Sequence, residues 1–385
     1  MTESIGLYVH IPFCATKCPY CDFYSVPYQS LLAEKYINTI VTHMKSYHDK
    51  GYIADTLYFG GGTPSLMKPE WIERIIQTAK DVFSLKGEIT IEANPNSVSL
   101  EKCKAYKQAG VNRISFGMQS NHENELSALG RTHKPNQVET AICFAREAGI
   151  FNISLDLMLG TPYQTLESVS KTLAHITTLP ITHISAYMLK IEPNTPFYNS
   201  AIINHCGDED LQSDIYLHTV SFLENMGFAQ YEISNFSKVG FESLHNLKYW
   251  NCEDYIGFGA SAHSHLGTKR FYHPNDIDEY IFTNGNHILY SDTHSNDLEE
   301  YVMLQLRLKK GLAFNRLVSD FGVDKNKLLR KAEQYEQYGL GNIKNDYLSL
   351  TPQGFLISNT LISDLLNAIA VNENSSLNLY KATKL

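Results

Sequence analysis

Three cysteines near the start of the chain have the type and spacing of metal ligands. Cys14, Cys18 and Cys21 lie within HIPFCATKCPYCDFYS, separated by three and then two residues. Cysteine thiolates bind soft metals and iron–sulfur clusters, and a [4Fe–4S] cluster held by three cysteines keeps one iron open for catalysis. A cluster used only for electron transfer usually has four cysteine ligands. Structural zinc is the alternative, because one of the 15 histidines could supply a fourth ligand.

Further polar groups follow apolar runs that read as strands. The segments YFGGGTPS (58–65), EANP (92–95) and GMQS (117–120) each come at the end of such a run, and Asp156 lies late in another. Taken singly, the glycines could form a turn and Glu92 could cap a helix. Active sites of β/α barrels assemble at the carboxyl ends of the strands, so these groups and the cysteine segment together predict one site at that rim.

The first two-thirds of the chain alternate between apolar, β-branched runs and amphipathic segments. The predicted strands are 5–11, 55–60, 88–94, 113–118, 151–159 and 183–189, and the predicted helices between them are 30–45, 70–83, 100–110, 136–149 and 166–179. Alternating strands and helices predict a parallel sheet with right-handed crossovers. Six such units favour an α/β fold, a partial (β/α)6 barrel, although a doubly wound open sheet has the same local pattern.

We predict three regions along the chain. Residues 1–205 form the barrel core with the cysteine loop, 206–290 form an extension of weaker pattern, and 291–385 form a C-terminal, mostly helical domain. Three helices followed by a hairpin make this last domain winged-helix-like. It has few clustered basic residues, which favours a structural or docking role over DNA binding.

Composition narrows the class of protein. The formal net charge of −9 argues against nucleic acid as a partner, since duplex binders usually have a basic face. No run approaches the roughly 18 apolar residues that span a bilayer, and the N-terminus lacks the basic and apolar regions of a secretory signal. Seven cysteines, four of them scattered, do not form a disulfide framework. These features predict a reduced, cytoplasmic protein without an integral membrane segment.

The motifs in combination resemble one enzyme family. CATKCPYC is similar to the CxxxCxxC signature of radical S-adenosylmethionine enzymes, and GGGTP resembles their loop for the amino group of that cofactor. More narrowly, YVHIPFC, GGGTPS, IEANP and GMQS resemble the oxygen-independent coproporphyrinogen III oxidase-like family, which includes the HemW-type heme chaperones. The resemblance extends from about residue 5 over nearly the whole chain.

The resemblance implies a role for each motif. Cys14, Cys18 and Cys21 would hold a [4Fe–4S] cluster whose open iron is chelated by S-adenosylmethionine. The implied contacts of this cofactor are Tyr8 and Tyr20 near the cluster, Gly61, Gly62 and Thr63 at its amino group, and Glu92, Gln119, Arg131 and Asp156 at its ribose and carboxylate. These residue types suit the groups, because carboxylates accept from ribose hydroxyls and the arginine fork matches a carboxylate.

Two features favour the chaperone branch over the oxidase branch. The oxidases resemble CxxxCxxCxC, whereas Phe23 occupies the position of the additional cysteine here. The oxidases also carry an N-terminal extension, whereas the strand before the cysteines starts almost at residue 5 in this sequence. HNLKYW (245–250) matches the HNxxYW heme motif of HemW-type proteins, which implies His245 as an axial heme ligand, with Tyr249 and Trp250 covering the macrocycle. The alternative is a surface loop in which His245 only forms hydrogen bonds. Cys252 is a second candidate ligand with a poorer match.

The sequence therefore favours a heme chaperone that carries a [4Fe–4S] cluster and S-adenosylmethionine and passes heme to an acceptor protein. Its expected partners are heme or porphyrin, a heme-accepting apoprotein and an electron donor such as flavodoxin or ferredoxin, and a homodimer is left open. The first alternative is oxidative decarboxylation of coproporphyrinogen III in porphyrin biosynthesis, which Phe23 argues against. The second is a zinc-stabilised interaction protein.

Overall fold

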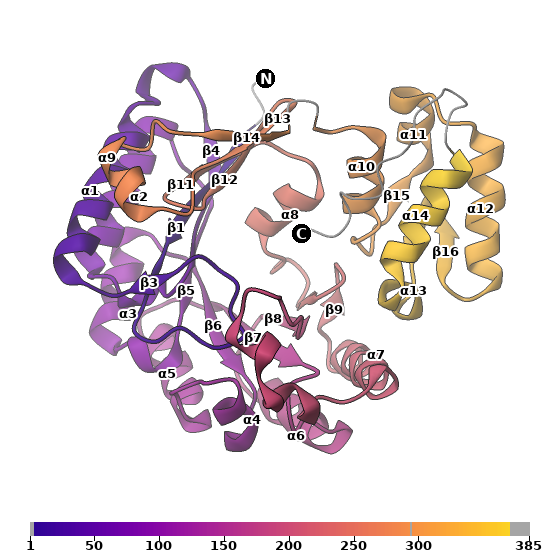
Figure 1. Cartoon of the computed structure of the whole chain (residues 1–385), viewed down its shortest axis with the longest axis horizontal. Helices are drawn as coiled ribbons and strands as arrows, with labels where there is room; N and C mark the ends of the chain where they lie inside the picture. The colour runs from indigo at the N-terminus through magenta and orange to yellow at the C-terminus, as the bar shows by residue number, and fades with distance from the viewer. Residues whose placement is uncertain (1–3, 293–294, 370–385) are drawn as a thin grey trace. The chain divides into compact units, whose positions relative to one another are not determined.

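The computed structural model describes residues 4–292 and 295–369, which divide into two compact units (Figure 1). The first unit takes in the described chain up to Gln230 together with Ser234–Tyr249 and Glu253–Ser295. The second takes in Tyr231–Ile233, Trp250–Cys252 and the described residues from Asn296 onward. The three-part division into 1–205, 206–290 and 291–385 stays a prediction, and residues 293, 294 and 370–385 of its last part lie outside the described residues.

Six parallel strands form the centre of the first unit. They are β1 (Ile5–Ile11), β4 (Ala54–Gly61), β5 (Glu88–Ala93), β6 (Arg113–Gln119), β7 (Asn152–Leu159) and β8 (His183–Met188). Their order in the sheet is their order in the chain. A doubly wound sheet would reverse its order at a switch point, so the predicted partial barrel is confirmed.

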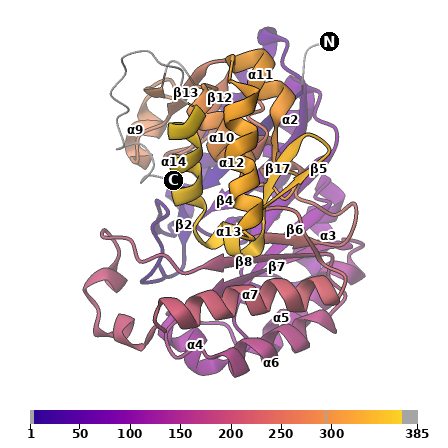
Figure 2. The same cartoon turned by 90° about the vertical axis from the view of Figure 1, so that its right-hand side faces the viewer.

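Helices connect these strands as the sequence predicted. They are α1 (Ser30–Lys45), α2 (Pro69–Phe83), α3 (Leu100–Ala109), α5 (Pro135–Glu147) and α6 (Leu166–Thr177). The Ser99 hydroxyl accepts from the Lys102 N–H at the start of α3, and Gly110 ends that helix at a φ of 121°. Figure 2 shows α7 (Glu209–Asn225) beside α6, at the end of the row of helices. The short α4 (Glu123–Ala128) was not predicted.

The sheet continues beyond both edges of the barrel. β11 (Tyr255–Phe258) pairs in parallel with β1, and β12 (His263–Leu266), β13 (Lys269–Tyr272) and β14 (Leu289–Asp292) follow it in antiparallel order. At the other edge, β10 (Asn235–Ser237) and β9 (Ala229–Gln230) follow β8. These strands have two to four residues each, too few to give a clear alternation in the sequence.

The two faces of the barrel sheet differ in polarity. Leu7, Val9 and Phe59 are fully buried on one face, and successive residues of a strand point to opposite faces. The other face carries Tyr8, Tyr58, Glu92, Ser115 and Asp156. Parallel strands covered on both sides usually read as continuous apolar runs. The polar alternate positions therefore mark the inner face of this barrel as a site and not as a packed core.

The second unit contains a winged-helix-like arrangement, in orange and yellow in Figure 1. Its elements are α10 (Leu298–Gln305), β15 (Leu312–Ala313), α11 (Phe314–Phe321), α12 (Lys325–Gln337), β16 (Gly341–Lys344), β17 (Tyr347–Leu350), α13 (Pro352–Leu356) and α14 (Ser358–Ile369). Asn345 and Asp346, both at positive φ, form the two-residue turn of the predicted hairpin. Among the described residues, no helix combines the length and apolar character needed to cross a membrane.

Candidate functional site

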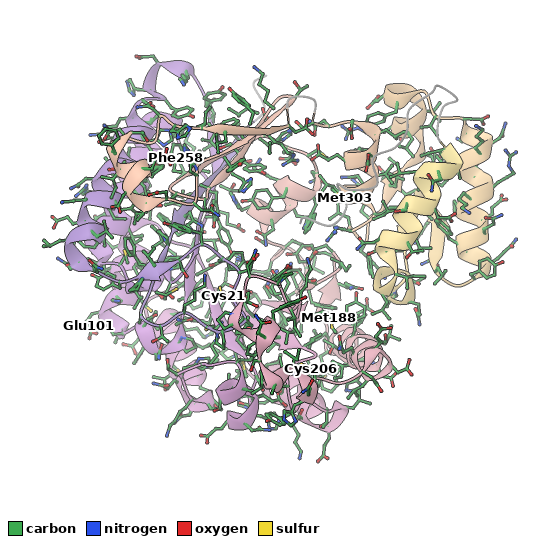
Figure 3. The ribbon with its side chains drawn as sticks, in the orientation of Figure 1. Cys21, Glu101, Met188, Cys206, Phe258 and Met303 are labelled. Atoms are coloured by element: carbon green, nitrogen blue, oxygen red, sulfur yellow. The ribbon has the colours of Figure 1, made fainter. Side chains whose placement is uncertain are left out.

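The cysteine loop lies between β1 and α1 and is closed by backbone hydrogen bonds. Cys14 ends β2 (Phe13–Cys14), which pairs with β3 (Val26–Pro27), and the Tyr28 N–H donates to the Cys14 carbonyl at 3.0 Å. The Cys21 N–H donates to the Cys18 carbonyl at 3.1 Å. All three thiols are free and partly exposed, and Cys21 is labelled in Figure 3. The loop thus presents three unprotected sulfur donors from one short segment.

The donor set fits an iron–sulfur cluster. Burial raises the pKa of Cys14 and of Cys21, and the charge of nearby Cys18 raises both further, so the three sulfurs are close enough to affect one another. Positive irons would reverse this effect and hold the thiolate forms. Within residues 4–292 and 295–369, no three His, Cys, Asp or Glu side chains converge on a position for one metal ion. A cluster takes each thiolate on a different iron, so its ligands surround it and need not converge.

The glycine loop after β4 packs directly against the cysteine loop. The Gly62 N–H donates to the Ile11 carbonyl at 2.8 Å, and the Thr63 N–H donates to the Phe13 carbonyl at 2.9 Å. A Cβ on Gly62 would lie 2.8 Å from the Phe13 oxygen and 3.0 Å from the Cys14 Sγ. The missing side chain therefore lets the GGGTP backbone approach the first cysteine.

Arg131 joins the cysteine loop to the end of β5. Its Nε donates to the Tyr20 hydroxyl at 3.1 Å, and its Nη1 donates to the Asn94 Oδ1 at 2.9 Å. The Asn94 Nδ2 donates in turn to the Thr63 Oγ1 at 3.3 Å. Asn94 was not among the predicted site residues, although it belongs to the EANP motif.

Gln119 ends β6 at a φ of 66°, in the left-handed region that non-glycine residues seldom adopt. The register with β7 shifts between Gly117 and Gln119, so the strand is irregular here. A Cβ on Gly117 would lie 3.1 Å from the Gln119 Nε2 and 3.4 Å from an Arg131 nitrogen. Polar groups thus gather over Gly117 at the carboxyl end of the strand.

Two carboxylates lie on the inner face beneath this rim. The Tyr58 hydroxyl donates to the Glu92 Oε1 at 2.8 Å, and the Ser115 hydroxyl donates to the Asp156 Oδ1 at 2.8 Å. Burial, and then the charge of Asp156, raise the pKa of Glu92 to about 7. Burial also raises the pKa of Asp156. Both carboxylates can accept hydrogen bonds from a ligand's hydroxyl groups in their charged forms, which these pKa shifts make dependent on pH.

Tyr8 is connected to the cysteine loop through His10. The Tyr8 Oη lies 3.0 Å from the His10 Nδ1, and the His10 Nε2 lies 2.9 Å from the Tyr24 carbonyl oxygen. Gly61 lies against the same imidazole, because a Cβ there would approach the His10 ring to 2.6 Å. His10 and Tyr58 were missed by the sequence reasoning, although both belong to the quoted motifs YVHIPFC and YFGGGTPS.

His245 lies in a helix, α8 (Leu244–Trp250), and is fully buried. Its Nδ1 is 2.8 Å from the Thr56 Oγ1 and its Nε2 is 2.8 Å from the Tyr249 hydroxyl. Burial, with the charge of Lys248, lowers the pKa of His245 to about 3. The imidazole is therefore neutral, the form that ligates iron, but both of its nitrogens are engaged in hydrogen bonds.

Helix α8 is attached near the amino ends of the barrel strands. The N–H groups of Leu244 and His245 donate to the Glu88 carboxylate, each at 3.2 Å, and Glu88 is the first residue of β5. The buried Lys248 ammonium lies 3.0 Å from the Asp55 carboxylate and 2.9 Å from that of Glu253. Figure 1 shows α8 on the face of the sheet opposite to α1, α2 and α3. The structure thus places His245 near the opposite end of the strands from the cysteine loop.

The HNLKYW motif is divided between the two units. The Tyr249 ring packs on Tyr255 in the first unit, with 4.6 Å between ring centroids. Trp250 and Cys252 belong to the second unit, where the Gln305 side chain donates to the Trp250 carbonyl at 2.8 Å. The Arg307 guanidinium lies 5.7 Å from the centroid of the Trp250 ring. His245 and Trp250 are therefore held by different sets of neighbours.

The sequence matches known families over most of its length. The Radical SAM superfamily matches residues 8–176, and the HemN C-terminal domain matches residues 292–357. The heme chaperone HemW of Bacillus subtilis (strain 168) is 36% identical over 375 residues, covering 94% of this chain and 99% of that relative. The heme chaperone HemW of Escherichia coli (strain K12) is 33% identical, covering 93% and 97%. The chain belongs to the HemW family.

The fold of this HemW family member is similar to that of a solved enzyme. Coproporphyrinogen III oxidase (HemN) from Escherichia coli, a radical SAM enzyme, aligns with a TM-score of 0.80 at 20% identity, over 94% of this chain and 90% of that one. This likeness supports the partial barrel and the C-terminal helical domain. The HemW matches confirm the resemblance that the sequence motifs predicted.

The structure brings one group of the predicted site residues together and places His245 apart from them. The predicted groups that lie together at the carboxyl ends of the strands are Cys14, Cys18, Cys21, Tyr20, Gly61, Gly62, Thr63, Gln119 and Arg131. Glu92, Asp156 and Tyr8 lie on the inner face below them. His245 lies apart, inside the barrel and near its amino end. Phe23 is 66% exposed on the cysteine loop.

Proposed function

We propose that this chain is a heme chaperone that binds heme, holds a [4Fe–4S] cluster with S-adenosylmethionine, and delivers heme to acceptor proteins. The observation that carries this function is the near full-length similarity to HemW chaperones, at 36% identity over 94% of the chain. The cysteine loop supports the cofactor part of the proposal, since its three free thiols fit a cluster with an open iron. When bound, the cluster and S-adenosylmethionine supply one-electron chemistry.

The family resemblance implies the roles that we propose for the residues of the rim and of the inner face, and their contacts support these roles. Cys14, Cys18 and Cys21 ligate the cluster, and the Arg131 fork pairs with the carboxylate of S-adenosylmethionine. The other proposed contacts are Tyr8 and Tyr20 near the cluster, Gly61, Gly62 and Thr63 at the amino group, and Glu92, Gln119 and Asp156 at the ribose and carboxylate.

We propose that His245 is the heme ligand. Its imidazole is neutral at physiological pH, as iron ligation requires. Ligation through Nε2 requires that the hydrogen bond to Tyr249 be exchanged for the iron. Because the side chain is fully buried, α8 must also move to admit a macrocycle. We therefore expect heme uptake to include a local opening of the chain around α8.

A hemin titration tests this function. The reconstituted protein, kept anaerobic, should bind one heme per chain with a shifted Soret band, and His245→Ala should lose this saturable binding. His43→Ala is the matched control, because His43 is also a buried imidazole, with its Nδ1 3.0 Å from the Tyr280 hydroxyl. Equal, non-saturating uptake by all three proteins would contradict the assignment of His245.

The alternative functions make different predictions. A zinc-stabilised protein would contain zinc, whereas the proposed cluster gives about four iron and about four sulfide per chain. The oxidase alternative has the fold likeness to HemN in its favour. Conversion of coproporphyrinogen III by the reconstituted protein would support it.

The remaining partners are also proposals. We propose an electron donor of the flavodoxin or ferredoxin type, a cytoplasmic location in keeping with seven free thiols, and a homodimer. The proposed regions remain 1–205, 206–290 and 291–385.

Binding of S-adenosylmethionine should depend on pH through Glu92. The unliganded carboxyl has a pKa of about 7, and its charged form is the better acceptor for ribose hydroxyls. Binding therefore releases a proton, and the affinity should rise by up to about tenfold from pH 6 to pH 8. Titrations across this range should show the rise, and Glu92→Gln should flatten it. The exposed Glu101→Gln is the control, and an equal pH profile in Glu92→Gln would contradict the assignment.

A further inference from the structure

A cluster of three stacked rings, Tyr8, Tyr58 and His245, lies beside the carboxylate of Glu92. The imidazole of His245 stacks on Tyr58, with 5.2 Å between ring centroids and 24° between the planes. Tyr8 stacks on both of these rings, with 6.3 Å between its centroid and that of Tyr58 and 6.5 Å between its centroid and that of His245. The hydroxyl of the same Tyr58 donates to the Glu92 Oε1 at 2.8 Å. Tyr58 thus touches the proposed heme ligand with its ring and the proposed ribose acceptor with its hydroxyl.

The orientation of Glu92 depends on this tyrosine. The carboxylate has two hydrogen-bond donors in the structure, the Tyr58 hydroxyl and the backbone N–H of Gly61. The Gly61 backbone is fixed by its strand pairing with β1. Tyr58 is therefore the donor whose position can change with its surroundings, and its ring position is set by Tyr8 and His245.

Iron ligation must change the contact between His245 and Tyr58. The two imidazole nitrogens are held by Thr56 and Tyr249, which fixes the plane that stacks on Tyr58. Ligation through Nε2 would replace the Tyr249 hydrogen bond, so the plane of the imidazole would be set by the iron and by Thr56 instead. A change of this plane changes the stacking contact with the Tyr58 ring.

We propose that Tyr58 is a positioning residue that transmits the state of His245 to Glu92, so that heme and S-adenosylmethionine change each other's affinity. This inference rests on the proposed function, in which His245 binds heme and Glu92 binds the ribose. Linkage requires the two effects to be equal in size, since each ligand shifts the same equilibrium. Couplings of this kind typically amount to about five- to 150-fold.

The test measures both affinities in the reconstituted full-length chain under anaerobic conditions. The dissociation constant of S-adenosylmethionine is determined with and without saturating heme, and that of heme with and without saturating S-adenosylmethionine. In the unchanged chain, the two ratios should agree and differ from one by about fivefold or more. In Tyr58→Phe, which keeps the stacked ring and removes the hydroxyl, both ratios should fall to near one. S-adenosylmethionine alone should bind that variant about tenfold more weakly.

A matched control removes the same kind of hydrogen bond elsewhere. The Tyr335 hydroxyl donates to the Asp364 Oδ2 at 2.9 Å in the second unit, so Tyr335→Phe reproduces the loss of a tyrosine–carboxylate bond. This variant should keep the coupling of the unchanged chain, and thermal melts should show whether the two variants are similarly destabilised.

The outcomes separate this inference from the function on which it rests. The positioning role would be overturned if Tyr58→Phe and the unchanged chain showed the same coupling between heme and S-adenosylmethionine. It would also be overturned if, in the unchanged chain, neither ligand changed the dissociation constant of the other. Absence of saturable heme binding would instead overturn the proposed function. The role of Tyr58 is then decided by the titration with S-adenosylmethionine alone, where an unchanged affinity in Tyr58→Phe overturns it.

Discussion

Cys14→Ala should leave the chain without a stable [4Fe–4S] cluster after anaerobic reconstitution. Iron and sulfide should fall from about four each per chain to below about one. Two of the three proposed ligands would remain, Cys18 and Cys21, and the other described cysteines lie in α3, α5, the segment before α7, and the second unit. Cys14 also lies against the glycine loop, with the Thr63 Oγ1 at 3.8 Å from its sulfur.

The control for this prediction is Cys143→Ala, which removes an exposed thiol from α5. It should keep the iron content of the unchanged chain. The melting temperature of the cluster-free Cys14→Ala protein should remain close to that of the cluster-free unchanged chain, because the Cys14 side chain is partly exposed. Full iron content in Cys14→Ala would refute the assignment of this ligand, and stoichiometric zinc in the unchanged chain would favour the interaction-protein alternative.

Gly61→Ala should abolish binding of S-adenosylmethionine and destabilise the chain. Gly61 has a φ of 110°, and a Cβ there would come within 2.6 Å of the His10 ring. That ring is held on both sides, by the Tyr8 hydroxyl and the Tyr24 carbonyl, so it cannot retreat without breaking a hydrogen bond. The collision with His10 and the unfavourable φ together should lower the free energy of unfolding by about 3–5 kcal/mol. The affinity for S-adenosylmethionine should fall by more than about 100-fold.

Gly240→Ala is the control that measures the cost of a positive φ without a collision between the new Cβ and a neighbouring side chain. Gly240 also has a positive φ, of 82°, but no atom lies within 4 Å of the position of its Cβ. This variant should lose only about 1–2 kcal/mol and should bind S-adenosylmethionine normally. Denaturant unfolding and a binding titration check both variants. A Gly61→Ala protein that binds as tightly as the Gly240→Ala protein would show that this loop does not contact the cofactor.

The barrel and its rim could be predicted because their signals are local. The alternation in IGLYVHI and EITIEA is present within one strand each, and GGGTP and EANP begin in the last two residues of β4 and β5. The partners inside the barrel could not be predicted in the same way. Tyr58 reaches Glu92 across neighbouring strands, and Ser115 reaches Asp156 likewise, so both contacts depend on strand register.

The position of His245 required the tertiary structure. From the sequence, His245 could be a heme ligand or a hydrogen-bonding residue in a surface loop. In the structure it is a buried residue of a helix. The contacts that place it are distant in the chain, since Thr56 and Glu88 are 189 and 157 residues away. The strands β11 to β14 were missed for a different reason, because four-residue segments are too short to distinguish alternation from chance.

The attachment of α8 also bears on how heme would be released. The hydrogen bonds from α8 to Glu88, and those from Lys248 to Asp55 and Glu253, favour the closed form of the empty chain. If only a fraction of the chains is open, the apparent affinity for heme is reduced by that fraction, about tenfold for each 1.4 kcal/mol of opening free energy. The same closure favours departure of the heme when an acceptor competes for it. A protein that must release its heme therefore benefits when its histidine ligand also forms favourable hydrogen bonds within the empty chain, here with Thr56 and Tyr249.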